Sequence, residues 1–243
     1  MEPAAAILRA RERLASADRV AVLTGAGISA ESGVPTFRGD GGLWRSFRAE
    51  DLATPEAFAQ DPKLVWEWYD WRRGLVAQVK PNPGHFALAR LERTIPHFTL
   101  ITQNVDGLHD RAGSTDPLKL HGDLWHVRCT HCGYRGVNLQ VPLAEIPPRC
   151  ECGALLRPDI VWFGESLPSD VLQTAWASAE EAELFLVVGT SALVQPAATL
   201  PLVAKRRGGF VIEVNPNRTP LSSSADLALL GLAGEILPQL LFS

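Results

Sequence analysis

A short apolar run that ends in a glycine-rich turn constrains the fold of this chain more than any other segment. Residues 19–23 read R-V-A-V-L, and residues 24–30 continue directly with T-G-A-G-I-S-A. An uninterrupted apolar run before a glycine turn is typical of a parallel strand that is buried on both faces and leads into a helix. The segment therefore predicts an α/β fold with a mostly parallel sheet and helices on both faces.

The same turn has the spacing of a dinucleotide-binding fingerprint, Gly25-x-Gly27-x-x-Ala30. In that fingerprint the first glycine permits the tight turn, and the second lets the backbone approach a pyrophosphate. The helix N-terminus then supplies N–H groups and the positive end of its dipole. An ordinary strand–helix turn shows the same spacing, so this pattern alone leaves both interpretations open.

Residues 32–44 depart from the usual fingerprint. A standard dinucleotide fold places a second strand with a terminal acidic residue about twenty positions further on. This chain instead has a glycine- and proline-rich segment, S-G-V-P-T-F-R-G-D-G-G-L-W. We expect a loop that covers the nucleotide, with Phe37 and Arg38 near its centre. A plain surface loop is the alternative.

Six further apolar runs predict the other strands of the chain. They lie at residues 98–102, 118–120, 160–163, 184–188, 210–214 and 227–230. Helical patterns occur between these strands and before the first one. They comprise an amphipathic first helix that uses Ile7, Leu8 and Leu14, an aromatic-rich helical stretch over residues 51–79, and a helix over residues 85–93.

Polar residues follow several of the predicted strands directly. They are Q-N-V-D at 103–106, His121 in the segment L-K-L-H-G-D, G-T-S at 189–191, and Asn215. Because ligands bind at the carboxyl ends of strands in open α/β sheets, these residues are candidates for a binding site. Other interpretations stay open at this point: the 103–106 segment could cap the next helix, and His121 could be a hydrogen-bonded structural histidine.

The four cysteines resemble the ligand set of a zinc ribbon. Cys129 and Cys132 form a C-x2-C pair, and Cys150 and Cys152 form a C-x-C pair seventeen residues later. Four thiolates leave no open position on a tetrahedral ion, so we expect one structural Zn²⁺. Disulfides are the alternative, and they are disfavoured in a cytoplasmic protein. We do not expect His131, inside the first pair, to be a ligand.

The charge and the apolar segments of the chain narrow its possible partners and location. The net charge is -4 at pH 7, whereas sequence-independent nucleic-acid binding needs a basic surface, so we expect no direct nucleic-acid partner. The N-terminal residues show no apolar core of signal-peptide length. Residues 184–204 are long enough for a membrane span, but their G-T-S turn and two prolines favour a strand, a turn and a helix. We expect a cytoplasmic protein with no membrane association.

Taken in order, the motifs of this chain resemble those of the sirtuins, which are NAD-dependent protein-lysine deacylases. The resemblance extends from about residue 17 to residue 234. Its motifs are G-A-G-I-S (25–29), G-V-P-T-F-R (33–38), T-Q-N-V-D (102–106), L-H-G (120–122), the four cysteines, V-W-F-G-E (161–165), G-T-S (189–191) and V-N (214–215).

The resemblance implies a Rossmann-like dinucleotide-binding domain and a smaller module, with NAD and the acylated lysine in the cleft between them. The dinucleotide-binding domain is expected to be discontinuous. The smaller module is expected to combine a cofactor loop and helical insertion with a zinc-ribbon insertion. We place the first domain at residues 1–33, 80–123 and 157–243, the loop and helical insertion at 34–79, and the zinc ribbon at 124–156.

The resemblance also assigns roles to the matching positions. His121 and Asn104 take the catalytic positions. The cofactor-binding positions are Gly25, Ala26, Gly27, Ile28, Phe37, Arg38, Gln103, Asn104, Asp106, Gly189, Thr190, Ser191 and Asn215. The substrate-binding positions are Ala53, Tyr69, Arg72, Val161, Trp162, Phe163 and Glu165.

The sirtuin reaction explains the need for a base at His121. In that reaction the acyl oxygen attacks the anomeric carbon of NAD as nicotinamide leaves, and a ribose hydroxyl must then be activated. A histidine that titrates near neutrality suits this proton transfer. The expected products are deacylated lysine, nicotinamide and an O-acyl-ADP-ribose.

Tyr69 and Arg72 match the Y-x-x-R pattern of the sirtuin subgroup that prefers succinyl- and malonyl-lysine. They are three residues apart and share a helix face. A guanidinium can hold a carboxylate bidentately, and a phenol can add a hydrogen bond. Ala53 matches a small residue that leaves space in the same pocket. Alternatively, Tyr69 packs in the core and Arg72 is solvated, a surface position that would also suit Arg73.

We therefore interpret the chain as an NAD-dependent protein-lysine deacylase for succinyl and malonyl groups, with weaker activity on acetyl groups. We expect a monomer that acts on acylated lysine side chains of proteins. Three other functions stay open. The chain could be mainly a lysine deacetylase, a protein mono-ADP-ribosyltransferase, or a non-catalytic NAD-sensing or zinc-dependent binding module. The last is disfavoured because a sensor need not keep a base.

Overall fold

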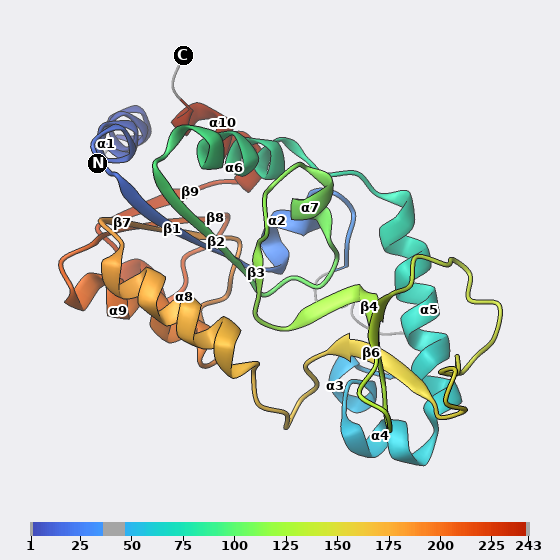
Figure 1. Ribbon diagram of the computed structural model, residues 1–243. Coiled ribbons are helices and arrows are strands. Elements are labelled where there is room, and N and C mark those ends of the chain that lie inside the picture. The colour runs from blue at the N-terminus through green and yellow to red at the C-terminus, as the bar shows by residue number, and fades with distance from the viewer. Residues whose placement is uncertain (1, 36–46, 242–243) are drawn as a thin grey trace.

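The computed structural model describes residues 2–35 and 47–241, which form two sheets of different size (Figure 1). The larger sheet has the strand order β3-β2-β1-β7-β8-β9, and every neighbouring pair is parallel. Its strands are β1 (Arg19–Thr24), β2 (His97–Thr102), β3 (Leu118–Lys119), β7 (Leu184–Val188), β8 (Phe210–Asn215) and β9 (Leu227–Leu230). The predicted α/β fold with a parallel sheet is confirmed.

Helices cover both faces of the larger sheet (Figure 1). Alternate residues of β1 point to opposite faces: Val20 and Val22 pack in one core, and Ala21 and Leu23 pack in the other. Both faces of the central strands are therefore dry, which explains their uninterrupted apolar sequences. The helices of the first core are α1 (Pro3–Ala15), α6 (Pro83–Thr94) and α10 (Ala233–Leu240), and those of the second are α8 (Ser169–Glu181) and α9 (Leu200–Arg206).

The buried face of α1 differs from the predicted one. Ala6, Ala10 and Leu14 face the core, and their four-residue spacing makes them one stripe along the helix. Ile7 is partly buried, whereas Leu8 is 57% exposed, so the predicted use of Leu8 is wrong. Two small alanines let the helix lie close to α10 and β9, and a search for large apolar residues overlooks them.

A second unit lies beside the larger sheet, at the lower right of Figure 1. It contains an antiparallel sheet with the order β5-β4-β6 and three helices. Trp66, Tyr69, Val127 and Ile160 pack in its core, so the helical segment and the cysteine-containing segment are packed together. Its elements are α3 (Ala49–Leu52), α4 (Pro55–Gln60), α5 (Pro62–Gln78), β4 (Gly122–Cys129), β5 (Arg135–Val137) and β6 (Leu156–Ile160).

The helical stretch predicted over residues 51–79 is divided among α3, α4 and α5. Thr54 Oγ1 accepts the N–H of Ala57, and Asp61 Oδ1 accepts the N–H of Leu64. Each of these residues is an N-cap, and a proline follows each one at the first helical position. Capping side chains and following prolines begin new helices, which explains the two breaks.

The strand predicted at residues 160–163 is also displaced. The observed strand β6 ends at Ile160 and pairs antiparallel with β4, outside the parallel sheet. Residues 161–163 follow the strand and border a cavity. Their apolar side chains produce the sequence pattern of a buried strand, although the residues lie in a loop.

The apolar stretch at residues 184–204 forms a strand, a turn and a helix, as predicted. Within residues 2–35 and 47–241, no helix combines the length and apolar character that crossing a membrane requires. The remaining short elements are α2 (Ala26–Ala30), α7 (Leu108–Arg111), η1 (Ala197–Thr199) and η2 (Pro220–Ser223).

Candidate active site

A cavity of about 530 Å³ lies where the carboxyl ends of β1, β2, β7 and β8 meet the second unit. Ligand sites in open α/β sheets occur at this edge. The structure brings seventeen of the predicted residues to its wall. They are Gly25, Ala26, Gly27, Ala53, Tyr69, Arg72, Gln103, Asn104, His121, Val161, Trp162, Phe163, Glu165, Gly189, Thr190, Ser191 and Asn215.

Direct backbone contact between two strand ends forms one part of this wall. The N–H of Gly27 donates to Gly189 O at 2.7 Å. A Cβ on Gly27 would lie 2.7 Å from Gly189 Cα, and Gly189 itself has a φ of 60°. A side chain at either position would therefore force the two segments apart. The fingerprint glycines thus serve this close approach within the protein.

Gln103 and Asn104 leave β2 at the same wall, and hydrogen bonds fix both side chains. Gln103 Nε2 donates to Thr190 Oγ1 at 3.1 Å. Asn104 Nδ2 donates to Gly25 O at 3.0 Å and to Ser29 Oγ at 3.1 Å. Since both N–H groups of Asn104 are used, Oδ1 is the atom that this side chain offers to a ligand.

The ring of His121 lines the cavity with a defined protonation pattern. Its Nδ1 lies 3.1 Å from Gln103 O, which can only accept, so Nδ1 carries the proton. The lone pair is then on Nε2. Burial lowers the pKa of His121 below 6.5, and the hydrogen bond to Gln103 opposes this shift only in part. The ring is therefore neutral at neutral pH and can accept a proton at Nε2.

The residue after His121 must be a glycine for steric reasons. Gly122 has a φ of 80°, and a Cβ there would lie 2.1 Å from Asp159 O. His121 O accepts the N–H of Val161 at 2.9 Å. The L-H-G pattern thus ties the histidine to the loop that follows β6.

Two buried histidines that the sequence did not indicate lie behind Asn104. His109 Nε2 is 2.9 Å from Thr24 Oγ1, which donates to Thr102 Oγ1, and Thr102 Oγ1 accepts the Asn104 N–H. The ring centroids of His85 and His109 are 4.9 Å apart. Burial lowers the pKa of His85 to about 4 and that of His109 to about 3. Both rings are therefore uncharged at neutral pH, and nothing in their sequence spacing connects them to Asn104.

Four predicted cofactor-binding residues are not among those that line the cavity. Ile28 is fully buried in the core above the sheet. Asp106 is 5% exposed, and its Oδ1 accepts the N–H of Leu108, the first residue of α7, at 2.8 Å. The N-cap of α7 is Gly107, so Asp106 binds the start of this helix from the residue before the cap. Burial raises the pKa of Asp106. Phe37 and Arg38 lie outside the described residues.

Tyr69 and Arg72 both reach the cavity from α5. Tyr69 is 1% exposed, and its Oη accepts the Trp162 Nε1–H at 2.8 Å. Burial raises the pKa of Tyr69 to about 12, so the phenol keeps its proton. The Arg72 guanidinium lies 5.0 Å from the ring centroid of Trp68. Burial lowers the pKa of Arg72, but a guanidinium remains charged at neutral pH.

Arg73 is fully buried, which contradicts the surface position suggested for it. Its Nη2 donates to Asn138 Oδ1 at 2.8 Å and also to Asn138 O. The guanidinium lies 5.3 Å from the ring centroid of Trp125. On the same helix, Asp70 Oδ1 accepts the N–H of Leu143 at 2.8 Å. One helix therefore borders the cavity and also holds the segment between the cysteine pairs.

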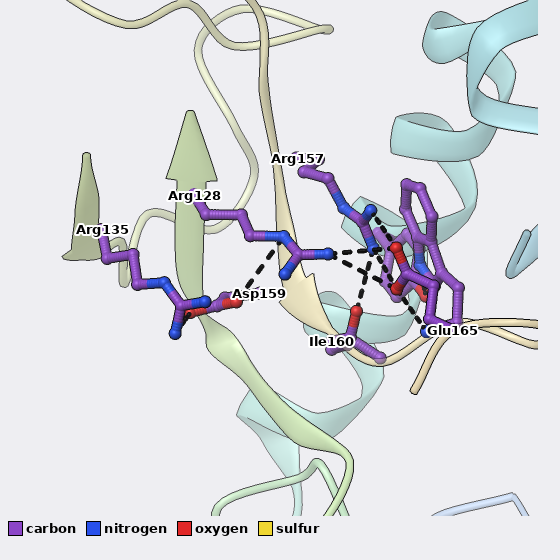
Figure 2. A network of polar contacts seen from close by, with 8 residues as sticks. Arg128, Arg135, Arg157, Asp159, Ile160 and Glu165 are labelled. Atoms are coloured by element: carbon purple, nitrogen blue, oxygen red, sulfur yellow. Dashed lines mark hydrogen bonds and ion pairs between the residues drawn. The ribbon is translucent and has the colours of Figure 1, made fainter. Parts of the chain in front are cut away.

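Glu165 lines the cavity, but protein groups bind its carboxylate (Figure 2). Arg157 Nη1 donates to Oε1 at 2.6 Å and Nη2 donates to Oε2 at 2.9 Å. The Trp162 N–H donates to Oε2 at 2.9 Å, and Arg128 Nη2 donates to Oε1 at 3.1 Å. Burial alone would raise the pKa of Glu165, but these partners outweigh it and lower the pKa. The carboxylate therefore holds the turn formed by residues 162–165.

The cavity also has lining residues that sequence reasoning missed. Val105 and Gly164 lie inside recognised motifs, and Ile160, Pro216 and Asn217 lie beside them, so their position in the sequence was a usable signal. The remaining four residues reach the wall only through folding. The missed residues are Glu50, Val105, Ile160, Gly164, Leu167, Val194, Gln195, Pro216 and Asn217.

The four cysteine sulfurs lie together, within 4.8 Å of one another. Cys129 Sγ is 3.5 Å from Cys152 Sγ, and Cys132 Sγ is 3.7 Å from Cys150 Sγ. Zinc–sulfur bonds of about 2.3 Å in a tetrahedron place the sulfurs about 3.8 Å apart. The cluster therefore fits a structural Zn²⁺ ion, including the tight C-x-C pair.

The chain matches the Sir2 family over residues 25–196, a span that includes the glycine turn, His121 and all four cysteines. It belongs to the Sir2 family. An NAD-dependent protein deacylase of Aquifex aeolicus (strain VF5) is 60% identical to this Sir2 protein over 209 residues, which cover 86% of this chain and 87% of the relative.

Solved Sir2 structures share the whole architecture of the protein. A mutant Sir2 homologue in complex with 2'-O-acetyl ADP ribose is 52% identical, with a TM-score of 0.91 over 96% of this chain and 94% of that chain. A Sir2 complex with a p53 peptide and NAD+ is 34% identical, with a TM-score of 0.85 over 94% of each chain. The predicted sirtuin family is confirmed.

We predict that Cys150→Ser abolishes zinc binding by this Sir2 protein. Loss of one thiolate opens the tetrahedral site and removes metal-linked folding energy. Zinc content, measured by atomic emission, should fall from one ion per chain to near zero, and the thermal unfolding midpoint should fall with it.

His131→Ala is the matched control for this substitution, because His131 is exposed between the first two cysteines. It should keep its zinc and its unfolding midpoint. Full zinc content in Cys150→Ser, or zinc loss in His131→Ala, would contradict the four-cysteine assignment.

Proposed function

We propose that this Sir2 protein is an NAD-dependent protein-lysine deacylase that prefers succinyl- and malonyl-lysine and acts more weakly on acetyl-lysine. The observation that supports this preference is the position of Tyr69 and Arg72, which line the same cavity as His121. A guanidinium and a phenol beside one another suit an acyl chain that ends in a carboxylate.

The charge states of the pocket support a carboxylate ligand. A buried carboxylate without a partner is costly, so a wholly apolar pocket would exclude a succinyl group. Arg72 supplies a permanent positive charge, and Tyr69 supplies a phenol whose pKa of about 12 preserves the proton. Ala53 O accepts the N–H of Phe163 at 2.9 Å, which places a small side chain at the same wall.

The proposed reaction also needs a binding site for NAD, and the residues at the strand ends support one. Backbone groups around Gly25 and Gly189, together with Asn215, line the part of the cavity nearest the parallel sheet. Asn104 Oδ1 and the Gln103 side chain add polar groups next to them. NAD would supply the electrophilic anomeric carbon, the nicotinamide leaving group and the ribose hydroxyl that receives the acyl group.

His121 is proposed as the general base of the reaction. Its Nε2 would take the proton of the ribose hydroxyl, and Gln103 O would stabilise the resulting imidazolium through Nδ1. Asn104 is held by Gly25 and Ser29, so it would present a fixed oxygen beside the reacting ribose. The Sir2 relatives solved with 2'-O-acetyl ADP ribose and with a peptide and NAD+ support this reaction type.

We predict that Arg72→Met lowers the ratio of desuccinylation to deacetylation, each measured as kcat/KM, by about 100-fold, the effect of losing a charge-assisted pair of hydrogen bonds. Methionine retains the apolar stem and removes the charge. Matched succinyl- and acetyl-lysine peptides, followed by mass spectrometry, provide the two rates.

Arg72→Lys is the control, because it keeps the charge and loses the bidentate fork. Its ratio should lie between those of the wild type and Arg72→Met. Equal losses of both activities in Arg72→Met would contradict the carboxylate-binding role. Labelled NAD that modifies a target protein, without nicotinamide release on acylated peptide, would favour ADP-ribosyl transfer instead.

We also predict the acid limb of the pH profile from His121. The base works only when its ring is neutral, so activity is present above its pKa and is lost as the pH falls through it. Burial lowers this pKa below 6.5, so the midpoint in kcat/KM should lie below 6.5. A midpoint above 6.5 would contradict this assignment.

A further inference from the structure

We propose that Arg157 is a positioning residue for acyl choice. By stacking on Trp162 and clamping Glu165, it holds the indole N–H on Tyr69 Oη and so directs the Tyr69 hydroxyl proton toward the acyl carboxylate. This inference rests on the proposed succinyl and malonyl preference. It assigns a role to a residue that does not line the cavity.

The polarity of the Tyr69 hydroxyl follows from its partner. An indole Nε1–H can only donate, so Tyr69 Oη is the acceptor in the 2.8 Å bond from Trp162. The single phenolic proton must therefore point elsewhere, and the cavity is the space that Tyr69 lines. Accepting one hydrogen bond also polarises the phenol as a donor. A carboxylate in the pocket then meets a donor, and an acetyl methyl group does not use it.

The orientation of Trp162 depends on Arg157. The guanidinium carbon of Arg157 lies 3.3 Å from the ring centroid of Trp162, which is stacking distance. The backbone N–H of Trp162 donates to Glu165 Oε2, and Arg157 binds both oxygens of that carboxylate. Arg157, Glu165 and Trp162 thus form a closed ring of contacts that fixes the indole in one position.

Among the described residues, Glu165 is the acid that pairs with Arg157. Its side chain is 11% exposed, Nη2 also donates to Ile160 O at 3.0 Å, and Nε has no hydrogen-bond partner in the described part of the chain. A lysine at this position would keep the positive charge, but it can neither stack on the indole as a plane nor bind both carboxylate oxygens as a fork.

Arg128 provides a matched comparison on the neighbouring strand. It binds the same carboxylate, with Nη2 at 3.1 Å from Glu165 Oε1, but its Nε lies 3.8 Å from Asp159 Oδ1 (Figure 2). Its guanidinium therefore bridges two acids, whereas that of Arg157 stacks on the indole. Arg128→Lys should loosen Glu165 without releasing Trp162.

The test is a double-mutant cycle on the full-length enzyme. Arg157→Lys and Arg128→Lys are made in the wild type and in Tyr69→Phe, and kcat and KM are measured with matched succinyl- and acetyl-lysine peptides. Arg157→Lys should lower the succinyl-to-acetyl ratio of kcat/KM about tenfold, the effect of one hydrogen bond, mostly through a higher KM for the succinyl peptide. Arg128→Lys should change the ratio less than about threefold.

The Tyr69→Phe background decides whether Arg157 acts through the hydroxyl. There, Arg157→Lys should leave the ratio unchanged, because the proton that it orients is gone. Equal loss of both activities, or the same tenfold loss in both backgrounds, would overturn the inference. If Arg157→Lys does not fold, Trp162→Phe replaces it in the cycle, since it deletes the N–H and should lower the ratio to the same extent.

The wild-type enzyme and Arg72→Met separate this inference from the proposed function. If the wild type does not favour succinyl-lysine, the proposed preference and the inference are both wrong. If the wild type favours it and Arg72→Met removes that preference, but the Arg157 cycle shows no coupling to Tyr69, only the inference is wrong.

Discussion

The close approach of two backbone segments at Gly27 and Gly189 is the constraint on which the active-site architecture depends. A hydrogen bond of 2.7 Å joins the turn after β1 to the turn after β7, at a distance where a Cβ on either residue would clash. The Asn104 side chain then binds Gly25 O on the same turn. This part of the cavity wall is therefore made from backbone, which leaves N–H and C=O groups in place of side chains beside the cavity.

A second constraint acts on the side of the cavity that α5 forms. The helix α5 presents Tyr69 and Arg72 to the cavity, while its neighbouring residues Asp70 and Arg73 bind the segment between the cysteine pairs. Trp66 Nε1 also donates to Leu156 O at 2.8 Å. A metal bound by the cysteines would thus stabilise the position of α5 from the side away from the cavity.

The sequence predicts the parallel sheet well because strands buried on both faces have a pattern that few other elements share. It predicts the glycine turn, the polar strand ends and the cysteine cluster for similar reasons, since each needs particular residue types at fixed spacings. The strand prediction fails at residues 161–163, where apolar side chains lie in a loop, and the predicted core position fails at Leu8, because alanines form the buried face of α1. The other residues that the sequence did not reveal have contacts with residues that are far away along the chain.

The buried histidines and arginines show this limit most clearly. His109 supports Asn104 through two threonines on different strands, and Arg157 supports Tyr69 through Trp162, far away in the sequence. Neither link has a spacing that a single sequence can reveal. Arginine is usually a surface residue. Arg73 is buried because the segment between the cysteine pairs folds over it.

A comparison of acyl groups with the wild-type enzyme tests the proposed succinyl and malonyl preference most directly. Peptides of one sequence, with acetyl-, succinyl- or malonyl-lysine, are incubated with NAD, and nicotinamide and O-acyl-ADP-ribose are quantified by mass spectrometry. We predict equal amounts of the two products and a higher kcat/KM for succinyl and malonyl than for acetyl. A higher kcat/KM for acetyl-lysine, or nicotinamide release without O-acyl-ADP-ribose, would contradict this prediction.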